Sequence, residues 1–258
     1  NGTTGYEEAA AQGLMAGINA VLKVRKKEPF ILQRNEAYIG VMIDDLITRG
    51  VIEPYRMFTS RAEYRLHLRE DNADSRLSKK GWELGVLPEK CYQQFQQKQL
   101  QINKLSGLVK AERITPTAAV QHELLLLGES PLKTGAKLAD LLKRPKLSIE
   151  RIRDCDAIGD EIDWNEYAAV VREQVEIEIK YAGYLSRQDQ ELKHINQLDR
   201  IALPEELQLS KIPGLSREVV EILAKTKPDT LGQASRITGM TPAAITILRV
   251  HLRTRQAA

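Results

Sequence analysis

The sequence predicts an all-α protein, and three observations lead to this prediction. Apolar residues recur at helical spacing along most of the 258-residue chain. Glycines and prolines separate these segments. No run of alternating apolar and polar residues is long enough for a central sheet, and only residues 30–32 and 56–58 resemble strands. With 42% apolar residues the chain can bury a core. We expect a multi-helix, bundle-like domain followed by a small C-terminal helical module.

Two helices are expected near the start. Residues 6–24 are rich in alanine and follow Gly2 and Gly5, so they form the first helix. Residues 38–48 carry apolar side chains at helical spacing and end before Gly50. Asp44 and Asp45 on this second helix are expected to lie on a solvated face.

A third helix is expected over residues 61–77, with Ser60 as its N-cap and Glu63 closing a capping box. On that helix four arginines fall within a stripe of roughly 80°, because each residue turns the helix by about 100°. They are Arg61, Arg65, Arg69 and Arg76. Guanidinium groups form bidentate pairs with phosphate, so the stripe suits a polyanion. The alternative is a solvated face whose arginines pair with nearby acids: Glu63, Glu70, Asp71 and Asp74.

The remaining expected elements are also helices, at residues 89–109, 117–127, 137–142 and 164–194. Three short helices follow Pro204. Ser216 and Thr241 are expected as N-caps, and Pro242 suits a first helical position. Such turns can present N–H groups to a nucleic-acid backbone or can simply pack together.

Composition narrows the class of protein only partly. The excess of 38 Lys and Arg over 35 Asp and Glu gives a net charge of +3, too small to identify a nucleic-acid binder. The excess is concentrated in residues 56–80 and in the segment after Pro204, which suggests contact with a long anion at two places. Cys91 and Cys155 are expected to be free and reduced. The four histidines have no metal-ligand spacing, and we expect no metal site and no catalytic residue in this chain.

No segment has the length and hydropathy of a membrane span, and the start is unlike a signal peptide. The chain begins inside what reads as a loop-to-helix junction, so we interpret Asn1 as a cut in a longer protein.

Three segments together resemble the C-terminal part of the MnmG (GidA) family: residues 1–13, 53–77 and 237–245. The resemblance extends over essentially the whole chain and is looser in the middle. It implies an FAD-dependent enzyme that modifies C5 of the wobble uridine of tRNA. It also implies NADH as reductant, the GTPase MnmE as partner, a homodimer and a cytoplasmic location. The family's G-x-G-x-x-G turn would lie upstream of Asn1, because no such motif occurs in this sequence.

The resemblance also implies site residues. The helix start at residues 2–6 would contact FAD, through Gly2, Thr3, Thr4, Gly5 and Tyr6. The tRNA would be bound by arginines in three segments: Arg56, Arg61, Arg65, Arg69, Arg187 and Arg236. Tyr55 or Tyr64 would stack on a splayed base, although core packing is the favoured interpretation for Tyr64. The remaining helix starts and tyrosines are equally explained by caps and packing.

We therefore predict three parts: the last helix of an FAD domain (residues 1–27), a helical domain (28–195) and a C-terminal module (196–258). The predicted function is binding of tRNA and MnmE, with FAD and NADH serving the full-length enzyme and this chain alone inactive. The alternative is a protein-interaction module without tRNA affinity, centred on Leu231, Ile237 and Ile245.

Overall fold

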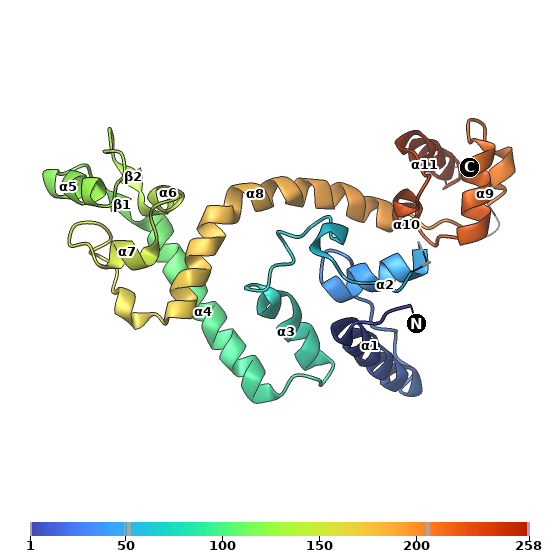
Figure 1. The fold of residues 1–258 in the computed structure, drawn as a ribbon, viewed down its shortest axis with the longest axis horizontal. Helices are drawn as coiled ribbons and strands as arrows, with labels where there is room; N and C mark the ends of the chain where they lie inside the picture. The colour runs from blue at the N-terminus through green and yellow to red at the C-terminus, as the bar shows by residue number, and fades with distance from the viewer. Residues whose placement is uncertain (1, 49, 51–52, 205–206, 257–258) are drawn as a thin grey trace. The chain divides into compact units, whose positions relative to one another are not determined.

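The prediction of an all-α protein is confirmed by the computed structural model (Figure 1). The structure describes residues 2–48, 50, 53–204 and 207–256, with the backbone alone at 191–196 and 255–256. Within these ranges the only sheet pairs β1 (Arg113–Ile114) with β2 (Ala136–Lys137) in antiparallel register. No described helix combines the length and the hydropathy needed to cross a membrane. The chain divides into two compact units: residues 1–68 with 187–258, and residues 69–186.

The first unit begins with α1 (Tyr6–Val24) and α2 (Tyr38–Thr48), which have the predicted bounds. Asn19 fastens the loop between them, since its side chain donates to the carbonyl oxygen of Phe30 (3.0 Å) and accepts from its N–H (2.7 Å). Residues 30–32 and 56–58, the two segments that resemble strands, form none. The nearest pairing is an isolated bridge between Thr3 and Tyr55.

The prediction of a helix over residues 61–77 is also wrong. A single 3₁₀ turn spans Thr59–Arg61, turns and bends follow, and α3 begins only at Ala73 and ends at Glu83. Ala62 and Tyr64 are buried while Glu63 and Arg65 are exposed, and residues 63–67 form a turn in which the N–H groups of His67 and Leu68 both donate to the carbonyl oxygen of Tyr64. Glu63 does not close a capping box because its carboxylate pairs with Arg34. A tertiary ion pair has therefore overridden the local capping signal.

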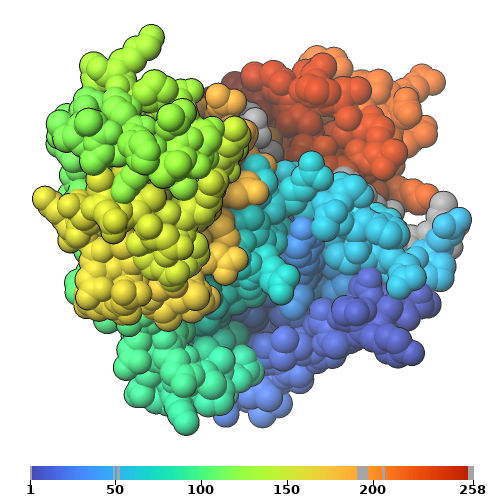
Figure 2. Space-filling model, turned by 60° about the vertical axis from the view of Figure 1, so that its left-hand side comes forward, coloured from blue at the N-terminus to red at the C-terminus, as the bar shows by residue number. Residues whose placement is uncertain are grey.

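The second unit is built on α4 (Glu89–Ala111), against which α3 and α6 (Leu138–Leu142) pack. Trp82 of α3 stacks on Tyr92 of α4, with ring centroids 4.6 Å apart. The unit also contains α5 (Ala118–Leu126) and α7 (Ile149–Arg153). In Figure 2 the green and yellow segments from β1 to α7 form one continuous packed body. Several helices contribute residues to its core, among these residues Leu105, Leu124, Leu142, Ile152 and Val175.

The long helix α8 (Ala169–Asp199) starts five residues later than predicted. Asp163 instead caps a 3₁₀ turn over Trp164–Glu166, and Tyr167 then takes an extended conformation. Val171, Val175 and Ile179 lie at helical spacing on the inner face of α8 and are buried. Glu176 and Lys180, four residues apart, form an ion pair at 2.7 Å.

The C-terminal part contains a 3₁₀ turn (Leu209–Lys211), α9 (Arg217–Thr226), α10 (Leu231–Arg236) and α11 (Pro242–Gln256). The predicted caps are confirmed: Ser216 accepts from the N–H of Val219 (3.2 Å) and Thr241 from that of Ala244 (3.2 Å). Leu231, Ile237 and Ile245 are all buried in or beside this core, so the predicted protein-contact centre on these three residues is wrong. They pack the module instead.

Candidate nucleic-acid interface

The predicted arginines differ in what their side chains do. Arg56 and Arg65 are exposed, and no ion pair to either is found among the described residues. Arg65 lies in a turn in which Ala62, Tyr64 and Leu68 are buried, while its own side chain is exposed. These two guanidinium groups are available to an external anion.

Arg61 is partly committed within its own unit. Its guanidinium lies over the ring of Tyr55, 4.5 Å from the centroid, and its Nε donates to the carbonyl oxygen of Arg56 (3.0 Å). Tyr55 is 1% exposed and its hydroxyl donates to Asp45 (2.9 Å). Burial, and then the charge of Asp45, raise the pKa of Tyr55 above its ordinary value. The prediction that Tyr55 stacks on a base is therefore wrong, and the core position favoured for Tyr64 is confirmed.

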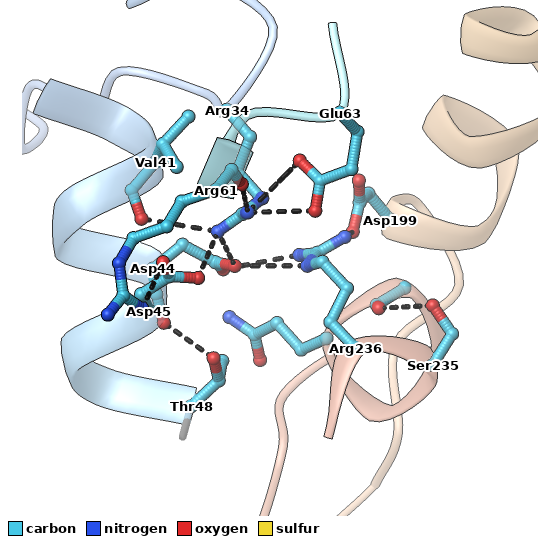
Figure 3. Close-up of polar contacts among 12 residues, drawn as sticks. Arg34, Val41, Asp44, Asp45, Thr48, Arg61, Glu63, Asp199, Ser235 and Arg236 are labelled. Atoms are coloured by element: carbon cyan, nitrogen blue, oxygen red, sulfur yellow. Dashed lines mark hydrogen bonds and ion pairs between the residues drawn. The ribbon is translucent and has the colours of Figure 1, made fainter. Parts of the chain in front are cut away.

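Arg34, which sequence reasoning missed, is the centre of a buried ionic cluster (Figure 3). One of its terminal nitrogens donates to Asp45 (2.8 Å), to Asp44 (3.0 Å) and to the carbonyl oxygen of Val41 (3.2 Å). The other donates to Glu63 (2.8 Å). Burial opposes the charge of Arg34, but the carboxylates of Glu63 and Asp45 more than offset it and raise the pKa above its ordinary value.

The predicted solvated face at Asp44 and Asp45 is therefore wrong. Their side chains are 14% and 2% exposed, because both carboxylates accept from Arg34. Charged groups are buried only when paired, so two adjacent aspartates on an otherwise apolar helix were the signal for a buried cation.

Arg236 of α10 extends the same cluster. Its Nε and one terminal nitrogen donate to the two carboxylate oxygens of Asp44 (3.0 and 3.2 Å), and the other terminal nitrogen donates to Asp199 (3.0 Å). Figure 3 shows the guanidinium groups of Arg34 and Arg236 both bonded to the carboxylate of Asp44. The side chain of Arg236 is 13% exposed. In this arrangement its guanidinium binds α2 and the end of α8, and its prediction as a tRNA contact stays a prediction.

The other two predicted arginines lie on different units. Arg69 makes a bidentate pair with Asp71 (2.8 and 3.0 Å) and lies over the ring of Tyr181, 5.1 Å from its centroid. Its side chain is 14% exposed. Arg187 is exposed on α8. The single arginine stripe predicted from a helical wheel therefore does not form.

The predicted cofactor segment starts α1. Gly2 has a φ of +83°, the carbonyl oxygen of Gly2 accepts from the N–H of Tyr55 (2.6 Å), and the ring of Tyr6 is 92% exposed. Gly5 is the N-cap, and a β-carbon there would lie 1.7 Å from the Glu8 carboxylate. That carboxylate accepts from the N–H of Met57 (2.8 Å), and this hydrogen bond lowers the pKa of Glu8. An anion already occupies the helix start, so the segment fits a flat, uncharged ring better than a phosphate.

The described residues offer neither an activated cysteine nor a metal-binding cluster. Cys91 and Cys155 are both free, as predicted. Burial, and then nearby carboxylates, raise the pKa of the Cys155 thiol, which disfavours the nucleophilic thiolate. Within the described ranges no three His, Cys, Asp or Glu side chains are grouped to hold a metal ion.

Three family models match the chain. One described as glucose inhibited division protein A matches residues 1–28. The MnmG/GidA C-terminal helical domain of a tRNA modifying enzyme matches residues 89–189, and the corresponding C-terminal helical bundle matches 191–258. These matches and the all-α fold define the class, which is the C-terminal helical region of tRNA-modifying enzymes.

The chain belongs to the MnmG/GidA family, as its relatives also indicate. It is 51% identical over 255 residues to the tRNA uridine 5-carboxymethylaminomethyl modification enzyme MnmG of Geobacter metallireducens, covering 99% of this chain and 40% of that protein. The MnmG of Caldicellulosiruptor saccharolyticus is 46% identical over 252 residues, 98% of this chain and 40% of that protein. A crystal structure of Aquifex aeolicus GidA matches with a TM-score of 0.79 and 43% identity, over 97% of this chain and 39% of that one. The chain thus spans about 40% of the length of the curated relatives it matches.

Proposed function

We propose that this chain is the helical region through which an MnmG-family enzyme docks tRNA and the GTPase MnmE. The whole enzyme would be an FAD-dependent, cytoplasmic homodimer that uses NADH and modifies C5 of the wobble uridine. Residues 2–6 would contact FAD through backbone and the exposed Tyr6 ring, and the flavin would supply the redox chemistry. The catalytic residues would lie outside this chain, which would be inactive alone. The three-part division at 27/28 and 195/196 belongs to the same proposal.

The observation that supports tRNA docking is the pair of exposed arginines in the family-like segment 53–77. Arg56 and Arg65 emerge beside the ionic cluster of Arg34, which holds the same stretch of chain in place through Glu63 and the carbonyl oxygen of Arg61. Phosphate contacts from arginine position a nucleic acid and contribute salt-dependent affinity. A rigidly held segment loses little freedom when it binds.

The test compares tRNA binding by the 258-residue chain at about 50 and 200 mM salt. Arg56→Ala/Arg65→Ala should weaken binding, and the log–log salt slope should fall by roughly one for each phosphate that the variant no longer binds. Lys110→Ala/Lys133→Ala removes the same charge from exposed positions in the other unit and serves as control. If the unaltered chain binds MnmE but no tRNA at low salt, the protein-interaction alternative replaces this proposal.

A further inference from the structure

A second basic site lies in the C-terminal module, away from the segment of Arg56 and Arg65. It is an open pocket of about 520 Å³ between the end of α8 and α11. Among the described residues its lining combines three arginines, one amide and three apolar side chains, with no carboxylate: Gln197, Arg200, Ile201, Ala202, Arg249, Leu252 and Arg253. Three positive charges around one hollow favour an anion.

The fold holds these arginines together. Leu248 and Leu252 are 0% and 5% exposed and fix α11 on the core of the module. Arg249 and Arg253 each follow one of these leucines, so they are one turn apart on the same edge of the helix. Leu198 is buried in the same core, and Arg200, two residues later, lines the same pocket.

No described carboxylate neutralises the charges of this pocket. No ion pair to Arg200, Arg249 or Arg253 is found within the part of the chain that the structure describes. Asp199, the neighbour of Arg200 in sequence, already binds Arg236 at 3.0 Å. The Nε of Arg249 is shielded from solvent and has no hydrogen-bond partner among the described residues. A buried donor without an acceptor is destabilising, so an external acceptor would relieve it.

We infer that this pocket binds a phosphodiester of RNA, which deepens the proposed function by giving tRNA a second contact in the C-terminal module. The arginine forks match the phosphate oxygens. The apolar wall of Ile201, Ala202 and Leu252 suits the ribose beside the phosphate, and an open pocket lets a polymer pass through. A free phosphate would use the arginines but not the apolar wall.

The first test is Arg200→Gln/Arg253→Gln, because both side chains are exposed and the substitutions leave the core intact. The matched control is Arg217→Gln/Lys225→Gln, two exposed cations on α9 of the same module. Thermal unfolding establishes that all variants fold. In tRNA binding at low salt the first variant should bind about tenfold more weakly and its salt slope should fall by about one. The control should change far less.

A second variant, Arg249→Gln, tests the shielded guanidinium and should weaken tRNA binding in the same direction. Equal binding by the Arg200/Arg253 variant and its control would overturn the inference while leaving the proposed function intact. Failure of the unaltered chain to bind tRNA would overturn both. Inorganic phosphate, titrated by calorimetry, distinguishes the two sources of the anion. If it binds with the affinity of the RNA site and displaces no tRNA, the pocket is a free-anion site and the inference is wrong.

Discussion

At the scale of single residues, Arg34 is the most consequential side chain of the first unit. Its side chain is 8% exposed, and its guanidinium donates to three carboxylates and two backbone carbonyl oxygens. Removing one partner of a buried ion pair leaves the other charge unpaired, and that cost commonly exceeds the net value of the pair itself. Arg34 therefore stabilises the first unit by compensating the buried charge of Asp45.

Arg34→Met is expected to destabilise the first unit by about 3–5 kcal/mol, because the buried carboxylate of Asp45 would lose the guanidinium that donates to it at 2.8 Å. Both tryptophans, Trp82 and Trp164, lie in the other unit, so the measurement is hydrogen exchange of the α2 amides. Arg65→Met, at an exposed position, should change the free energy of opening measured by exchange of these amides by less than about 0.5 kcal/mol. Equal effects of the two substitutions would refute the role assigned to Arg34.

The carboxylate of Glu8 should make the stability of the folded chain depend on pH. The N–H of Met57 holds the pKa of Glu8 below its ordinary value of 4.5 in the folded state. A lowered folded pKa contributes stability that is present above the unfolded pKa and disappears as pH falls through the folded pKa. The Tm advantage of the unaltered chain over Glu8→Gln should therefore be present at about pH 6 and shrink below about pH 4.5. Glu7→Gln, one residue earlier on the exposed face, is the control, and the difference in Tm between it and the unaltered chain should not shrink as the pH falls.

At the scale of elements, the turn before α11 in the C-terminal module requires a glycine at position 239. Gly239 has a φ of +92°, a region that L side chains rarely adopt, and a β-carbon there would lie 2.7 Å from the Cδ1 of Ile222 on α9. Gly183, within α8, has no atom within 4 Å of such a β-carbon. The same substitution should therefore have opposite effects at these two glycines.

Gly239→Ala is expected to lower stability by more than about 1 kcal/mol, whereas Gly183→Ala should raise it by about 0.5–1 kcal/mol through helix propensity. Thermal unfolding followed by circular dichroism measures both. A stabilising Gly239→Ala would mean that the turn relaxes to a negative φ and that the glycine is not required.

The elements also show what the sequence can predict. The bounds of α1 and α2 follow from a long apolar period ended by glycine or loop residues, and the caps at Ser216 and Thr241 are local hydrogen bonds. The stretch 61–72 could not be predicted in this way, because its conformation depends on Arg34, which lies 29 residues before Glu63. The strands β1 and β2 have two residues each and are too short to show a period.

At the scale of the molecule, the first unit is assembled from the two ends of the chain. Arg236 and Asp44 are 192 residues apart in sequence, and their bidentate pair joins α10 to α2 within that unit. Closing so long a loop costs conformational entropy, which the contacts between the two ends must offset. The candidate site also depends on residues from both ends of the chain. Arg56 and Arg65 follow from sequence, whereas the cluster that holds their segment needs residues from both ends.

The last prediction concerns that junction. In a double-mutant cycle, Asp44→Asn and Arg236→Gln should show a coupling free energy between about 0.5 and 3 kcal/mol, because both side chains are mostly shielded from solvent. The exposed pair of Asp140 and Lys143, whose side chains are 57% and 55% exposed, is the control and should couple by less than about 0.5 kcal/mol. Hydrogen exchange of α10 and α11 reports the first cycle, and urea unfolding followed by tryptophan fluorescence reports the second. Equal coupling in the two cycles would show that the pair of Asp44 and Arg236 is no stronger than a surface ion pair and that other contacts hold the two ends of the chain together.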